Sequence, residues 1–173
     1  MAGRTVYTVL EETAAAHPQK PALQQPVGGG KYRSWTWREY RDAVRQIAVG
    51  LRAAGVRKGE TVGLQSETRA EFYLADMAVM AAGAVSAALY TSLPHADQAA
   101  TLCASDARVV FVENVKALRA LERAGAGRLN VRETGRVFAK KPARDNATDP
   151  QQQFGGPSKP IKHVALRYEG PSP

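Results

Sequence analysis

Residues 61–94, with the sequence TVGLQSETRAEFYLADMAVMAAGAVSAALYTSLP, decide the fold class of this 173-residue chain. The pattern predicts a strand over residues 61–65, a helix over residues 69–82 that ends at Gly83, and a strand of small apolar residues over 84–89. Neither strand alternates polar with apolar residues, which indicates that both faces of each strand are covered. A strand, a helix and a buried strand in this order predict a βαβ unit with a parallel sheet and a right-handed crossover.

The same order of elements continues toward the C-terminus. We expect a helix over residues 96–105, a strand over 108–112 and a helix over 115–123. The predicted fold class is therefore α/β: an incomplete doubly wound, mainly parallel sheet with flanking helices, followed by a disordered basic tail.

Toward the N-terminus the pattern predicts a hairpin and two helices. Val6, Val9 and Leu10 recur at helical spacing, and residues 22–25 and 31–36 are predicted strands on either side of three glycines. Thr36 is followed three residues later by Glu39, the spacing of a capping box, so a long helix should begin there. Its expected buried face consists of Tyr40, Val44, Ile47 and Leu51. The helix should end at Gly55.

Composition divides the chain near residue 122. Residues 1–122 carry 14 lysines and arginines against 12 acidic residues, whereas residues 123–173 carry 10 against 4 and hold only 15 apolar residues. Most of the formal net charge of +8 therefore belongs to the last 51 residues. We predict that residues 1–122 form a folded unit and that residues 123–173 are a disordered or out-of-frame tail. A short strand could form over 164–168, but the sequence offers no evident partner for it.

The single cysteine and the apolar runs exclude several protein classes. Cys103 cannot form an internal disulfide, and its Ala-rich surroundings favour a buried, inert thiol over a nucleophile. Glu11 and Glu12 interrupt any apolar run of a signal peptide, and the apolar region 77–90 is too short for a membrane span. We expect a cytoplasmic protein, with peripheral membrane association of a complete enzyme left open. The histidines, at positions 17, 95 and 163, show no metal-ligand spacing.

Four segments, in order, resemble acyl-CoA ligases of the adenylate-forming superfamily. They are residues 32–40 (YRSWTWREY), 50–62 (GLRAAGVRKGETV), 66–85 (SETRAEFYLADMAVMAAGAV) and 90–94 (YTSLP). The last segment is similar to long-chain fatty acid–CoA ligases. The resemblance implies that residues 1–122 are the N-terminal part of an AMP-binding domain. The implied parent reaction converts a fatty acid, ATP and CoA to acyl-CoA, AMP and pyrophosphate, with Mg as the ion that accompanies ATP.

The motifs that bind ATP in that superfamily are not present in the 173 residues. The segment most similar to the family's phosphate loop is residues 155–160 (GGPSKP), and it lacks the preceding hydroxyl residues and the closing glycine. Without such donors around a triphosphate, ATP binding and transition-state stabilisation would be missing. We therefore expect the isolated chain to be inactive and to bind no cofactor, as a truncation or frameshift product of a ligase would be.

Candidate site residues lie where the predicted strands end. In open α/β sheets ligands bind beyond the carboxyl ends of the strands, so Ser66, Tyr90, Thr91 and Ser92 are candidate substrate-binding residues. The alternative is that they serve only as loop and capping residues. The sequence suggests no catalytic, cofactor-binding or metal-binding residue.

Two other functions remain open from the sequence. The chain could be a non-catalytic α/β module that docks on a full-length ligase, or it could contact nucleic acid through its basic tail. The tail's scattered charges favour no specific nucleic acid. An exposed apolar face, where further sheet would pack in a complete enzyme, could mediate self-association or binding to a full-length ligase. We expect no transmembrane segment.

Overall fold

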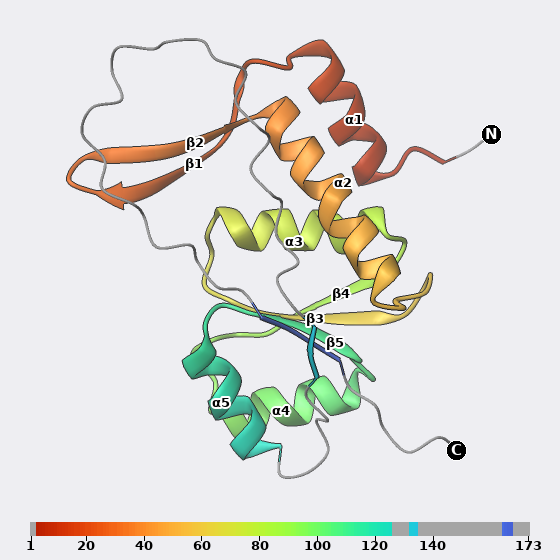
Figure 1. Cartoon of the computed structure of the whole chain (residues 1–173), viewed down its shortest axis with the longest axis vertical. Helices are drawn as coiled ribbons and strands as arrows, with labels where there is room; N and C mark the ends of the chain where they lie inside the picture. The colour runs from red at the N-terminus through yellow and green to blue at the C-terminus, as the bar shows by residue number, and fades with distance from the viewer. Residues whose placement is uncertain (1–2, 126–131, 135–163, 168–173) are drawn as a thin grey trace.

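A computed structural model of the chain describes residues 3–125, 132–134 and 164–167, and its centre is a five-stranded sheet (Figure 1). The strand order is β4 (Val85–Ala88), β3 (Thr61–Gln65), β5 (Val109–Val112), β7 (Val164–Arg167) and β6 (Arg132–Thr134). Strand β3 pairs in parallel with β4 and with β5, whereas β7 runs antiparallel to both β5 and β6. The three strands predicted from residues 61–112 therefore form the parallel part of the sheet.

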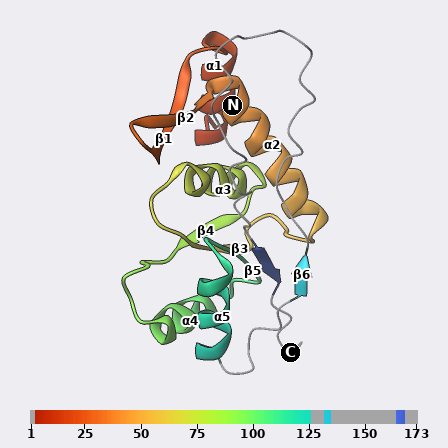
Figure 2. The same cartoon turned by 60° about the vertical axis from the view of Figure 1, so that its left-hand side comes forward.

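The two crossovers place helices on opposite faces of this sheet. Helix α3 (Ala70–Ala81) connects β3 to β4, and helix α4 (His95–Ala104) connects β4 to β5. The chain moves along the sheet in opposite directions in these two steps, and α3 and α4 cover opposite faces (Figures 1 and 2). Two crossovers of the same hand require this arrangement, which is the predicted doubly wound fold.

Strand β5 shows why its sequence lacks polar residues. All four of its residues are buried. Val109 and Phe111 belong to the core that α2 and α3 cover, while Val110 and Val112 belong to the core shared with α4 and α5 (Val115–Ala124). Because successive side chains point to opposite faces, a strand covered by helices on both sides is apolar throughout.

The N-terminal elements form a further layer above α3. Helix α2 (Trp37–Ala53) packs on α3 and α1 (Val6–Ala16) packs on α2, while β1 (Pro21–Gly28) and β2 (Lys31–Thr36) form the predicted antiparallel hairpin (Figure 1). Thr36 caps α2 as predicted: its hydroxyl accepts from the Glu39 backbone N–H, and the Glu39 carboxylate accepts from the Thr36 N–H. The expected buried face of α2 is confirmed at Tyr40, Val44, Ile47 and Leu51.

The turn from α3 into β4 depends on a glycine, as the sequence predicts. Gly83 has φ of +73°, a left-handed conformation that disfavours side chains with a Cβ. Its carbonyl accepts from the N–H of Gly59, which lies in the turn before β3. Helix α3 can therefore lead directly into the edge strand β4.

The helix predicted from the spacing of Val6, Val9 and Leu10 is confirmed as α1, whose buried residues are Leu10 and Ala14. Two expectations differ from the structure. Cys103 is exposed rather than buried, because Leu102, its neighbour on α4, is the residue that faces the sheet. The strand at 164–167 does have partners, since β7 pairs with β5 and β6. Most of the tail predicted over 123–173 lies outside the described residues.

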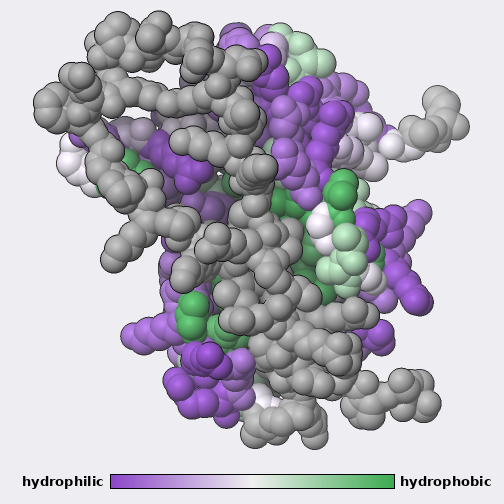
Figure 3. All heavy atoms as spheres, in the orientation of Figure 1, coloured by the Kyte–Doolittle hydropathy of each residue, from purple (hydrophilic) through white to green (hydrophobic). Residues whose placement is uncertain are grey.

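The surface of the described residues is mostly polar over α1 and α2, and hydrophobic atoms gather near the level of the sheet (Figure 3). Within the same residues, no helix combines the length and the apolar character that crossing a membrane requires.

Candidate functional site

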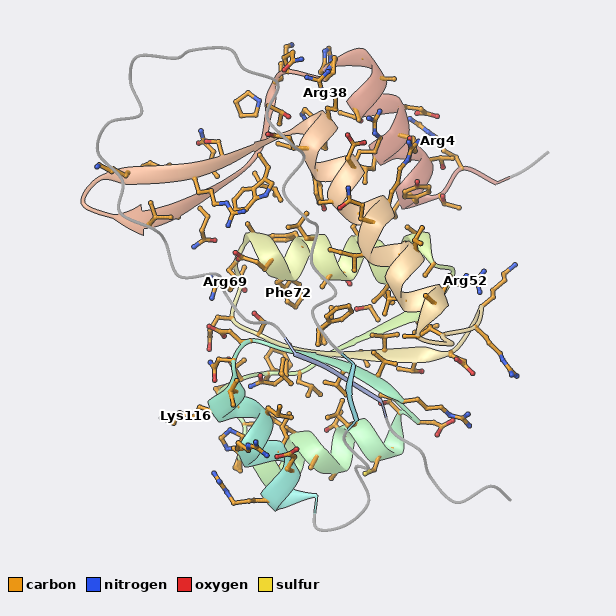
Figure 4. All side chains as sticks on the ribbon, in the orientation of Figure 1. Arg4, Arg38, Arg52, Arg69, Phe72 and Lys116 are labelled. Carbon is orange, nitrogen blue, oxygen red and sulfur yellow. The ribbon has the colours of Figure 1, made fainter. Side chains whose placement is uncertain are left out.

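The parallel strands bring the predicted site residues to one edge of the sheet. Because β3, β4 and β5 run in the same direction, the loops that follow them begin at the same edge, which we call the carboxyl edge. Arg69 and Phe72, at the start of α3, lie at this edge (Figure 4). A small depression beside them is lined by residues that include Ser66, Phe72 and Phe111.

Glu67 links two of the four predicted residues. The Thr91 hydroxyl donates to the Glu67 carboxylate at 2.5 Å, and the Ser66 hydroxyl donates to the Glu67 carbonyl oxygen at 3.0 Å. Tyr90 is 77% exposed, and Ser92 is also exposed without a hydrogen bond to another described residue. The structure thus connects the loops after β3 and β4 through Thr91 and leaves Tyr90 and Ser92 at the surface.

Arg69 forms two ion pairs at the carboxyl edge. Its guanidinium lies 2.8 Å from the Glu71 carboxylate and 3.2 Å from the Glu113 carboxylate. The other oxygen of Glu113 accepts from the Glu67 backbone N–H at 3.0 Å. Only 9% of the Glu71 side chain and 22% of each of the other two are exposed, so these ion pairs are largely shielded from water.

Arg69 and Glu71 were not among the residues expected at this edge from the sequence. A usable signal was present, because Glu113 directly follows one predicted strand, and Arg69 and Glu71 begin the predicted helix after another. Through Glu113, which contacts Arg69 and the Glu67 backbone N–H, the end of β5 is joined to the start of α3 and to the loop after β3. The carboxyl edge is therefore tied together by its own side chains.

Two buried glutamines lie in the same region. Gln98 of α4 is fully buried and donates to the Leu93 carbonyl oxygen at 2.7 Å, which fixes the loop between β4 and α4. Gln65, the last residue of β3, is 5% exposed. Within the described part of the chain, neither Oε1 atom accepts a hydrogen bond from a protein group. Each amide oxygen is thus an acceptor with unused capacity.

The resolved pKa shifts lie elsewhere, between α1 and α2. Burial raises the pKa of Tyr7, and the hydrogen bond with the Glu11 carboxylate raises this pKa further. Burial alone would raise the pKa of Glu11, but hydrogen bonds from Arg45 and Tyr7 outweigh it and lower that pKa. Burial raises the pKa of Tyr40 to about 12, with a smaller contribution from Asp76. These groups stabilise the helix layer and do not form a cleft with perturbed acids and bases.

The chemistry available at the carboxyl edge is limited. Two carboxylates, those of Glu71 and Glu113, pair with one guanidinium, and among the described residues no group of three or more His, Cys, Asp or Glu side chains could hold a metal ion. The hydroxyl of Thr91 donates to a carboxylate rather than to a histidine. The carboxylates of the described residues at this edge can accept hydrogen bonds from a ligand.

Comparison with known proteins identifies the family. The sequence model described as "AMP-binding enzyme" matches residues 10–166. The chain belongs to the AMP-binding enzyme family. This match extends beyond residue 122 into the segment that composition separates as a tail, and it includes β6 and all but the last residue of β7.

Several known proteins are similar to parts of this chain. The uncharacterized protein Rv1549 of Mycobacterium tuberculosis is 39% identical over 90 residues, which cover 52% of this chain and 50% of that protein. The long-chain-fatty-acid–CoA ligase FadD15 of Mycobacterium bovis is 32% identical over 91 residues, which cover 53% of this chain and 15% of the ligase. The chain therefore matches half of the first relative and a small share of the second.

A solved structure supports the fold. The anthranilate CoA ligase AuaEII, in complex with anthranoyl-AMP, superposes with a TM-score of 0.63 and 25% sequence identity, over 71% of this chain and 23% of that one. The α/β arrangement described above is thus that of part of an AMP-binding enzyme. These relatives differ in the acids that their names give, so the family alone does not define a substrate.

Proposed function

We propose that this chain is the N-terminal portion of an ATP-dependent fatty acid–CoA ligase. Its membership of the AMP-binding enzyme family over residues 10–166 is the observation that carries the proposal. The segment YTSLP at 90–94 and the similarity to FadD15 favour a fatty acid over other carboxylic acids. The similarity to an anthranilate CoA ligase makes an aromatic acid the competing substrate class.

In the proposed complete reaction, the carboxylate of the acid attacks the α-phosphorus of Mg-ATP and releases pyrophosphate. The thiol of CoA then attacks the carbonyl carbon of the acyl adenylate and releases AMP. The described residues supply no group for either step at the carboxyl edge, where the charged side chains pair with one another. Their proposed contribution is to position the loops after β3 and β4, with Ser66, Tyr90, Thr91 and Ser92 nearest to the substrate.

The isolated chain tests one part of this proposal. The purified 173-residue protein is incubated with Mg-ATP, labelled pyrophosphate and either palmitate, decanoate or anthranilate. We expect no ATP–pyrophosphate exchange, since the sequence lacks a phosphate loop of the family type. Exchange above the rate without acid would contradict the proposed inactivity, and its dependence on the acid would then identify the substrate.

A chimaera tests the scaffold role directly. Residues 3–122 of this chain replace the segment of AuaEII that superposes on them, and formation of anthraniloyl-CoA is measured. We expect a folded chimaera to retain adenylation, because the donated segment positions loops rather than reacting groups. A folded chimaera that binds ATP but forms no adenylate would contradict the scaffold role. A shift of preference toward decanoate would show that the segment also selects the acid.

A further inference from the structure

A second pocket lies at the opposite edge of the sheet, where β3 and β5 begin. It is lined by residues that include Gly55, Arg57, Glu60, Thr61 and Arg108, and it has a volume of about 90 Å³. That volume is several times the roughly 10–15 Å³ that a single water molecule requires. We call it the arginine pocket. Its lining residues follow the end of α2 and lie at the start of β3 and β5, so the length of the strands separates it from the candidate site.

The pocket contains donors that the protein itself does not use. Among the described residues, the Arg57 guanidinium and the Thr61 hydroxyl make no hydrogen bond or ion pair. The Arg108 guanidinium lies 3.9 Å from the Asp106 carboxylate, whose side chain is 76% exposed, so that ion pair is weak. Two guanidinium groups and a hydroxyl are therefore available to a ligand.

The acidic groups at this edge do not neutralise it. The Glu60 carboxylate accepts from the Arg57 backbone N–H at 2.8 Å and so holds the turn before β3. Asp106 lies 3.9 Å from Arg108 and is not among the residues that line the pocket. Among the lining residues, the single carboxylate of Glu60 stands beside the two guanidinium groups of Arg57 and Arg108, a balance that favours an anion.

We propose that the arginine pocket binds a phosphate group. The planar guanidinium presents parallel N–H donors that match the oxygens of phosphate, and Arg57 and Arg108 come from two separate segments that can approach one anion from different sides. The Thr61 hydroxyl supplies a further donor. The site is independent of the proposed ligase activity, because it uses none of the residues at the carboxyl edge.

The test is a titration of the ¹⁵N-labelled 173-residue protein with inorganic phosphate, at constant ionic strength and pH 7.5. We expect saturable shifts of the amide signals of Gly55, Arg57 and Arg108. The variant Arg57→Gln/Arg108→Gln should bind about tenfold more weakly, since two charge-assisted interactions are lost. Signals from the hydrophobic core of each variant show that it remains folded.

Two further variants separate a built site from general charge. Lys20→Gln/Arg38→Gln removes two cations at the far end of the molecule, near the start of α2, and should change phosphate affinity by less than about twofold because the Debye length is about 10 Å. Glu60→Gln keeps an acceptor for the Arg57 N–H but removes a negative charge from the pocket. It should strengthen binding by about threefold.

Glycerol 3-phosphate distinguishes the two sources of a phosphate group. Equal or tighter binding than inorganic phosphate would assign the pocket to the phosphate of a larger molecule, and weaker binding would assign it to the free ion; both results support the proposal. The proposal is overturned if neither compound shifts the pocket signals, or if the Lys20/Arg38 variant loses as much affinity as the Arg57/Arg108 variant.

Discussion

The two ends of the parallel strands carry charged residues in opposite states. At the carboxyl edge Arg69, Glu71 and Glu113 form ion pairs with one another, and Thr91 donates to Glu67. At the amino edge Arg57 has no partner and Arg108 has only a distant one among the described residues. A concentration of polar residues therefore does not by itself mark a binding site. What distinguishes the two edges is whether the groups are already satisfied within the fold.

The largest effect on stability should follow from replacing Arg69, the cation that pairs with two carboxylates at the carboxyl edge. Arg69→Met removes the guanidinium that pairs with the mostly buried Glu71 and Glu113 carboxylates, and it leaves Arg33, at 3.9 Å, as a more distant cation for Glu71. We expect the free energy of unfolding to fall by about 2–3 kcal/mol, below the range for fully buried pairs because Arg69 is partly exposed. Urea unfolding measures the change.

A matched control for Arg69 is Arg119→Met. Arg119 pairs with Glu122 at 3.2 Å on α5, and 63% of its side chain is exposed. Its loss should cost less than about 0.5 kcal/mol. Equal effects of the two substitutions would mean that the carboxyl edge is not a structural network.

The next effect lies between the two edges, at Gly63 in β3. A Cβ there would come within 2.5 Å of Leu102 in α4 and 3.2 Å of Val110 in β5. Because both neighbours are buried, Gly63→Ala should lower the free energy of unfolding by about 1–2 kcal/mol. Gly3→Ala, where nothing lies within 4 Å, is the control and should be neutral in thermal unfolding.

A smaller effect separates two of the candidate substrate residues. Thr91→Val removes the hydrogen bond to Glu67 and should lower the free energy of unfolding by about 1 kcal/mol. Ser92→Ala removes a hydroxyl without a described partner and should leave stability unchanged. Denaturation curves that show the same stability for both variants would argue that Thr91 is not part of the structural network.

The smallest effect is expected at the amino edge. Arg57→Gln/Arg108→Gln removes charges that have no close partner, so the free energy of unfolding should change by less than about 0.5 kcal/mol. The measurement is thermal unfolding in phosphate-free buffer. A loss comparable to that of Arg69→Met would show that these arginines stabilise the fold, and the contrast between the edges would disappear.

The elements with strong local signals could be predicted from the sequence. Helix α2 begins at the predicted capping box of Thr36 and Glu39, and β5 is covered on both faces as its apolar run indicates. The exposure of Cys103 could not be read in the same way, because an Ala-rich helix gives little indication of which face packs on the sheet.

The pairing at the two edges could not be predicted, because it joins residues far apart in the chain. Arg69 and Glu113 are 44 positions apart, and they meet only because β3 and β5 are neighbours in the sheet. Arg57 and Arg108 converge for the same reason. The partners of β7 also depend on strand order, which local patterns do not specify.

The most direct test of the contrast between the edges is a map of amide signals during one titration with inorganic phosphate. The account predicts shifts at Gly55, Arg57 and Arg108, and constant positions for Glu67, Thr91 and Glu113, whose neighbourhood is acidic and already paired. Shifts confined to Glu67, Thr91 and Glu113 would contradict it, since the carboxyl edge would then be the part of the sheet that is open to an anion.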